Sequence, residues 1–159
     1  MKIIFLDFDG VINSFSTGRR NLPETKYKGL EAEAQELNPD LIGLLNKIIR
    51  ITGAKVVVSS MWRLHRSKEE LIEILEYRNF KGEVVDITPD FSGTHFNRSD
   101  EIEEWIDNCK DTIESFVILD DGYEEYLIEK FKNNFILIEK SNGLNKYHVK
   151  KAIQILGAK

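Results

Sequence analysis

Short runs of apolar residues recur along the chain, and each stops abruptly at polar or acidic residues. The first run, Ile3 to Leu6, shows no polar alternation and leads directly into Asp7. Such runs are typical of strands that are buried on both faces of a parallel sheet. Similar runs predict further strands at residues 55–60, 83–88, 115–119 and 135–138.

Segments with apolar residues at helical spacing separate these runs, as in residues 41–49. A shorter helix is predicted at residues 124–133. Good N-cap residues predict where the other helices begin: Asn38, Ser67, Ser99 and Asn145. Alternating strands and helices predict an α/β fold, with a Rossmann-like parallel sheet of about five strands and helices on both faces.

The composition is that of an ordinary globular protein, with 159 residues and 42% apolar content. We expect one domain over residues 1–159. The inserts at residues 14–37 and 89–98 have room for a lid but not for a large cap domain. The single cysteine, Cys109, excludes an internal disulfide and fits a reducing compartment. The apolar start is too short for a signal peptide or a membrane span, so we expect a cytoplasmic protein.

Carboxylates and hydroxyls follow three of the predicted strands. Ligands of open parallel sheets bind at the carboxyl ends of the strands, so these side chains should meet at one edge of the domain. Gly10 permits a tight turn where another group must come close. The residues that should converge there are Asp7, Asp9, Ser59, Asp120 and Asp121. Taken alone, Asp7 to Gly10 also fit a plain polar turn after a strand.

Several carboxylates gathered in one place repel one another unless a cation joins them. The candidate ligands are all oxygen atoms, and the three histidines have no ligand spacing near them. This donor set favours Mg²⁺ over Zn²⁺. A carboxylate–Mg²⁺ site beside a hydroxyl and a basic residue suits phosphoryl transfer.

The ordered motifs resemble those of the haloacid dehalogenase-like (HAD) phosphohydrolase superfamily. They are Asp7-Phe8-Asp9-Gly10, Val56-Val57-Val58-Ser59 and Ile118-Leu119-Asp120-Asp121, each following or ending an apolar strand. The resemblance covers nearly the whole chain. It implies a Mg²⁺-dependent phosphomonoester hydrolase with a HAD-like fold and a minimal cap.

The same resemblance implies a role for each site residue. Asp7 is the nucleophile that forms an aspartyl-phosphate, and Asp9 is the general acid and then the base. Ser59 hydrogen-bonds the phosphoryl oxygens. Asp7, the backbone carbonyl of Asp9, and Asp120 hold the metal, with Asp121 binding it through water or orienting the basic group. The roles of Asp120 and Asp121 could be exchanged.

Two residues compete for the role of the basic catalytic group. Arg98 lies at the start of a predicted helix, on the side of the site. Lys110 lies twelve positions later, about 18 Å away along a helix. We therefore assign the role to Arg98, although the family more often has lysine there.

Shorter strings narrow the resemblance to the small phosphatase domains associated with RNA-repair proteins, which are similar to the 3′-phosphatase domain of polynucleotide kinase-phosphatases. These strings are residues 9–13, 59–63 and 100–105. They make Gly10, Ser60 and Arg63 candidates for substrate binding. A nucleic-acid end would also suit the basic residues of the first insert (Arg19, Arg20, Lys26 and Lys28) and the aromatic rings of Phe15 and Trp62.

The sequence leaves other functions open. The net charge of −5 favours a small-metabolite substrate over a nucleic-acid end. A phospho-receiver or other signalling module uses a similar acidic site, but it offers no place for the Asp120-Asp121 pair. A silent scaffold has no need of Asp7 and Asp9. We expect a phosphorylated substrate, small molecule or nucleic-acid end, and no membrane partner; the oligomeric state is open.

Overall fold

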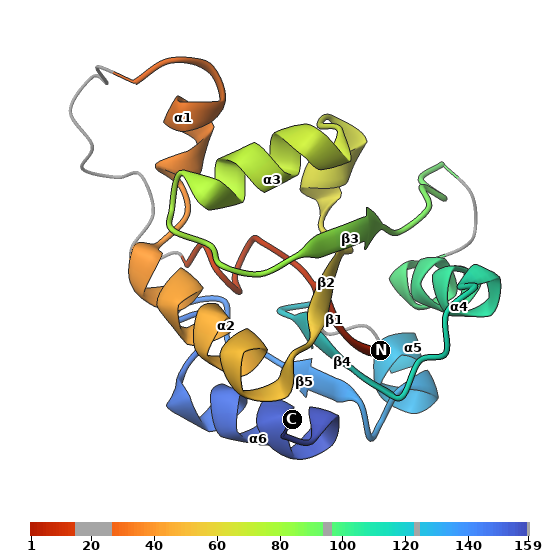
Figure 1. Ribbon diagram of the computed structural model, residues 1–159. Coiled ribbons are helices and arrows are strands. Elements are labelled where there is room, and N and C mark those ends of the chain that lie inside the picture. The colour runs from red at the N-terminus through yellow and green to blue at the C-terminus, as the bar shows by residue number, and fades with distance from the viewer. Residues whose placement is uncertain (15–26, 94–96, 123–124, 159) are drawn as a thin grey trace.

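The computed structural model describes residues 1–14, 27–93, 97–122 and 125–158, and it is built around one parallel sheet (Figure 1). The strands lie in the order β3-β2-β1-β4-β5, and every neighbouring pair is parallel. Their bounds are β1 Lys2–Leu6, β2 Lys55–Val58, β3 Val84–Ile87, β4 Ser115–Asp120 and β5 Phe135–Leu137. The predicted α/β fold with a five-stranded parallel sheet is therefore confirmed.

Helices cover both faces of the sheet, as the alternation of elements predicts (Figure 1). One face packs against α1 (Gly29–Ala34), α2 (Pro39–Thr52), α3 (Lys68–Glu76) and α6 (Lys146–Leu156). The other face packs against α4 (Arg98–Asn108) and α5 (Glu125–Lys130). A short 3₁₀ helix, η1 (Met61–Leu64), follows β2.

The central strand β1 is the most deeply buried part of the sheet. Residues 3–6 have no exposed surface, and they send side chains alternately to the two cores. Phe5 packs edge-on against Trp105 of α4, with 5.4 Å between the ring centroids. This packing fixes α4 over the end of the sheet that carries the acidic residues.

Three of the four predicted helix starts are confirmed by side-chain caps at Asn38, Ser67 and Asn145. The fourth prediction, Ser99, is wrong by two residues. Asn97 caps α4 instead, because its side chain accepts the backbone N–H of Ser99 while Asp100 accepts the N–H of Asn97. As a result α4 begins at Arg98, whose backbone belongs to the first turn.

The first insert contains α1, and its residues 15–26 lie outside the described part of the chain. The expectations placed on Phe15, Arg19, Arg20 and Lys26 fall on these residues. No helix among the described residues is long and apolar enough to cross a lipid bilayer.

Candidate active site

The carboxyl ends of the three central strands lie level with one another. Leu6 of β1 pairs with Val58 of β2 on one side and with Leu119 of β4 on the other. The next residues along the three strands are therefore neighbours, and they are Asp7, Ser59 and Asp120. The convergence expected from strand order is present for these three residues.

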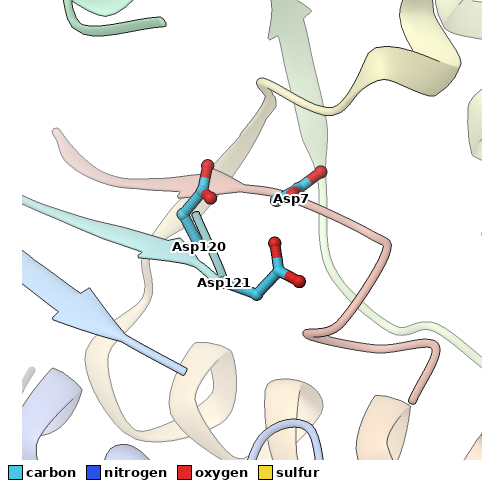
Figure 2. Close-up of side chains that lie close together, drawn as sticks. All are labelled: Asp7, Asp120 and Asp121. Atoms are coloured by element: carbon cyan, nitrogen blue, oxygen red, sulfur yellow. The ribbon is translucent and has the colours of Figure 1, made fainter. Parts of the chain in front are cut away.

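Three carboxylates meet at this edge. Asp7, Asp120 and Asp121 each offer an oxygen atom, and these oxygens all lie within 4.8 Å of one another. Figure 2 shows the three side chains gathering from the ends of β1 and β4. Such spacing could hold a metal ion, and an all-carboxylate donor set suits a hard cation.

Burial and mutual repulsion make this cluster electrostatically unfavourable by itself. Burial raises the pKa of Asp120 to about 6, and the charge of Asp7 adds to the rise while Arg98 opposes it. Burial and Asp7 also raise the pKa of Asp121, against the attraction of Lys140 and Arg98. A bound cation would relieve both effects.

Arg98 supplies a positive charge to the cluster from the first turn of α4. Its Nη1 atom lies 2.7 Å from Asp120 Oδ2 and 3.3 Å from Asp7 Oδ2. With the three carboxylates ionised, one guanidinium leaves two negative charges, which matches a divalent cation. Lys110 lies beyond the end of α4 on the exposed surface, so the geometry favours Arg98 as the basic residue.

Gly10 is required by a close approach between two loops. Its φ is +72°, and a Cβ at this position would lie 2.1 Å from Asp121 Oδ2. Glycine allows both the backbone conformation and the contact. The group that comes close to Gly10 is therefore Asp121, and a substrate contact at Gly10 stays a prediction.

Asp9 stands apart from the three clustered carboxylates, and its side chain is exposed. Trp62 Nε1 donates to Asp9 Oδ2 over 2.9 Å, and Asn13 Nδ2 donates to Oδ1 over 3.0 Å. These two donors fix the position of the Asp9 carboxylate. The part of the metal-binding prediction that concerns Asp9 rests on its backbone carbonyl and stays a prediction.

Ser59 has a buried hydroxyl that makes no hydrogen bond within the described structure. An unsatisfied buried hydroxyl costs free energy, and a ligand oxygen would satisfy it. Because Ser59 is fully covered, a phosphoryl group can reach it only after a neighbouring side chain moves. Ser60 caps η1 instead, with its Oγ 3.5 Å from the backbone nitrogen of Trp62.

Arg63 differs from the sequence-based expectation of a substrate-binding residue. Its guanidinium is buried, and all five of its N–H groups donate within the protein. The acceptors are the carbonyls of Ser59, Ser60, Thr88 and Pro89 and the carboxylate of Glu101. No N–H group is left for a substrate, so Arg63 ties the ends of β2 and β3 to α4.

Two groups beside the site were not predicted from the sequence. Thr88, at the end of β3, has a second buried hydroxyl without a partner in the described residues. Glu101 completes the Arg63 pair, with a 2.5 Å contact to Nη2, and its other oxygen accepts the N–H of Phe91. The position of Thr88, a polar residue at a strand end directly before Pro89, indicates a place near the site. Nothing in the sequence indicates that Glu101 pairs with Arg63.

The fold and the site together define a class of protein. A parallel α/β sheet whose central strand ends in Asp7-Phe8-Asp9, next to Ser59 and the Asp120-Asp121 pair, is that of a HAD-type hydrolase. The family model described as "HAD domain in Swiss Army Knife RNA repair proteins" matches residues 3–149, and the chain belongs to this family. The resemblance drawn from the motifs is thus confirmed. No curated protein and no solved structure gives a significant match.

Proposed function

We propose that the protein is a Mg²⁺-dependent phosphomonoester hydrolase that works through an aspartyl-phosphate on Asp7. The observation that carries the proposal is the meeting of Asp7, Asp120 and Asp121 beside the unsatisfied hydroxyl of Ser59. The three carboxylates carry more negative charge than Arg98 alone neutralises, and the neighbouring Ser59 hydroxyl lacks an acceptor among the described residues. A phosphoryl group bound with a divalent cation satisfies both.

The first chemical step transfers the phosphoryl group to the protein. A carboxylate oxygen of Asp7 attacks phosphorus, and the bond from phosphorus to the leaving oxygen breaks. Asp9 donates its proton to that oxygen, so an alcohol departs. The guanidinium of Arg98, in contact with Asp7, keeps the nucleophile oriented.

The second step returns the protein to its starting state. Asp9, now ionised, accepts a proton from a water molecule that attacks phosphorus. The bond between Asp7 and phosphorus breaks, and inorganic phosphate is released. Trp62 and Asn13 hold the Asp9 carboxylate in one place through both steps.

The residues present fit Mg²⁺. The donors are carboxylates without sulfur or imidazole, and their charge beyond that of Arg98 suits a divalent ion. Asp7, Asp120 and Asp121 would hold it, and it would neutralise negative charge on the transferring phosphoryl group.

Removing the metal should stop the reaction. We expect excess chelator to lower turnover by about 100-fold or more, because the phosphoryl charge is then unscreened, and added Mg²⁺ to restore it. A thermal melt gives a second readout: at about 100 times its Kd, Mg²⁺ should raise Tm by about 8 °C. Asp121→Asn should shrink that shift, and Asp107→Asn, at an exposed position, should preserve it. Full turnover in chelator would contradict the metal proposal.

Replacing Asp9 by asparagine should lower turnover more for esters with poor leaving groups than for esters with good ones. General acid–base catalysis is worth about 10²- to 10⁴-fold, so we expect a loss of that size on an alkyl phosphate. The loss should be smaller on p-nitrophenyl phosphate, whose leaving group needs little protonation. Asp40→Asn, an exposed position on α2, is the matched control. A loss below about tenfold on the alkyl ester would rule out the role.

Two substrate classes remain. The first is nucleic-acid 3′-phosphate ends or nucleotides, and the second is small phosphorylated metabolites. Membership in a family named for RNA-repair proteins supports the first.

The signalling alternative loses support from the strand order. Receivers place strand 3 beside strand 1, whereas here β2 separates the edge strand β3 from β1. The carboxylate of Asp86 on β3 accepts the indole N–H of Trp105 instead.

A further inference from the structure

A pocket of about 400 Å³ opens directly beside Asp9. It is lined by Asp9, by Glu33 and Glu36 at the α1 side, by Met61 and Trp62 of η1, and by His65 and Arg66 after η1. The volume lies within the range of about 300–1,000 Å³ that is usual for small-ligand pockets. The pocket contains the proposed general acid but none of the three clustered carboxylates.

An ion pair, a hydrogen bond and an aromatic contact connect the walls of this pocket. Arg66 forms a two-pronged ion pair with Glu33, at 3.0 Å from Nε and 2.5 Å from Nη2, and so ties α1 to the turn after η1. Trp62 is fixed by its bond to Asp9 and by packing against Phe8, with ring centroids 5.4 Å apart. These contacts join α1, η1 and the loop that carries Asp9 around the pocket.

The lining combines an apolar surface with carboxyl groups. Met61 is 54% exposed, and it lines the pocket together with Trp62. Glu33 pairs with Arg66, and Glu36 and Asp9 also contribute carboxyl groups to the lining. This surface favours a flat, uncharged group and disfavours a ligand with a negative charge in addition to its phosphate.

We propose that this pocket binds the leaving group of the substrate, and that it takes an uncharged alcohol carrying a flat aromatic ring, as in a nucleoside. The inference rests on the proposed function: because Asp9 gives its proton to the leaving oxygen, the alcohol must lie beside Asp9. The base stacks on Trp62 and Met61, and carboxylate oxygens accept hydrogen bonds from N–H or O–H groups of the ligand.

Binding can be measured without catalysis. Adenosine, which has no phosphate, is titrated while tryptophan fluorescence is recorded, with ribose as the ring-free control. We expect adenosine to bind, with little dependence on salt, and ribose to give no signal. Met61→Glu should weaken adenosine binding about tenfold by removing apolar contact and adding charge. Met61→Leu should keep binding, and Tyr147→Glu, the same kind of change on exposed α6, should have no effect.

Catalysis supplies the second arm of the test. Adenosine 3′-phosphate and glycerol 2-phosphate are both phosphates of secondary alcohols, and they differ in the ring. We expect kcat/KM to favour the first by about tenfold or more, and Met61→Glu to lower this ratio about tenfold, mainly through KM. 2-Phosphoglycerate, whose leaving group is anionic, should be the poorest of the three.

The outcomes separate the two proposals. Equal activity on the two secondary esters, unchanged in Met61→Glu, together with no adenosine binding, would overturn the pocket and leave the phosphatase intact. Adenosine binding that Met61→Glu weakens, with no hydrolysis of any ester, would overturn the phosphatase and retain the pocket as a nucleoside site. Adenosine binding that persists in Met61→Glu places the nucleoside elsewhere and overturns the pocket.

Discussion

Replacing Asp7 by asparagine is expected to lower phosphatase turnover by about 10⁴-fold or more, because the variant has no carboxylate to form the covalent intermediate. The folded protein should remain as stable as the wild type. Asparagine keeps an oxygen that can accept the N–H of Phe8, now 2.8 Å from Asp7 Oδ1. The change also removes one charge from a crowded acidic cluster, and Arg98 keeps Asp120 as its partner.

Two measurements check this expectation. Steady-state hydrolysis gives the loss of turnover, and intact-protein mass spectrometry of the quenched reaction shows whether a phosphoryl group is attached. The wild type should carry the added mass and Asp7→Asn should not. The matched control is Asp107→Asn, at an exposed position in the last turn of α4. Near-normal turnover in Asp7→Asn, or an unchanged phosphoryl adduct, would exclude Asp7 as the nucleophile.

The second large effect concerns stability. Arg63→Met should destabilise the fold by about 3–5 kcal/mol, since it leaves Glu101 as an unpaired buried carboxylate and frees four backbone carbonyls. Burial lowers the pKa of Arg63, and the negative charge of Glu101 opposes that change. A loss of this size corresponds to a Tm lower by about 10 °C.

Urea titration of four variants tests this account. Arg63→Met and Glu101→Leu should each destabilise the protein strongly, and the double variant should recover part of the loss, because neither charge is then left alone. Arg50→Met, at an exposed position on α2, is the control. If Arg63→Met has the same urea midpoint of unfolding as the wild type, the hydrogen bonds of Arg63 do not stabilise the fold. Any loss of activity in Arg63→Met should be equal for short and long substrates, since the guanidinium has no donor left for a phosphate.

The position of the acidic site could be predicted because it depends on the backbone alone. Once the apolar runs are read as parallel strands, Asp7, Ser59 and Asp120 must come to the same edge, whatever the side chains do. The choice of Arg98 over Lys110 had the same basis, since the N-terminal end of a helix after a parallel strand faces that edge.

The environment of Arg63 could not be predicted in the same way. Arg63 follows the end of β2, which is expected to bind phosphate by resemblance to the HAD superfamily. Its place in the sequence therefore indicates a substrate contact. The 3₁₀ turn of η1 directs the side chain back under the strand ends, where carbonyls from β2 and β3 meet it. The predicted helix start at Ser99 is wrong for a similar reason, because the cap is Asn97, two residues earlier, and only the backbone geometry shows this.

The contact between Gly10 and Asp121 links two distant positions in the evolution of this sequence. Any side chain at position 10 would put a Cβ within 2.7 Å of three atoms of the Asp121 side chain, and φ of +72° adds a second penalty. A chain that keeps aspartate at 121 therefore keeps glycine at 10 for reasons of volume, with or without a substrate. A descendant that loses the glycine must also shorten or relocate residue 121, so the two positions should change together.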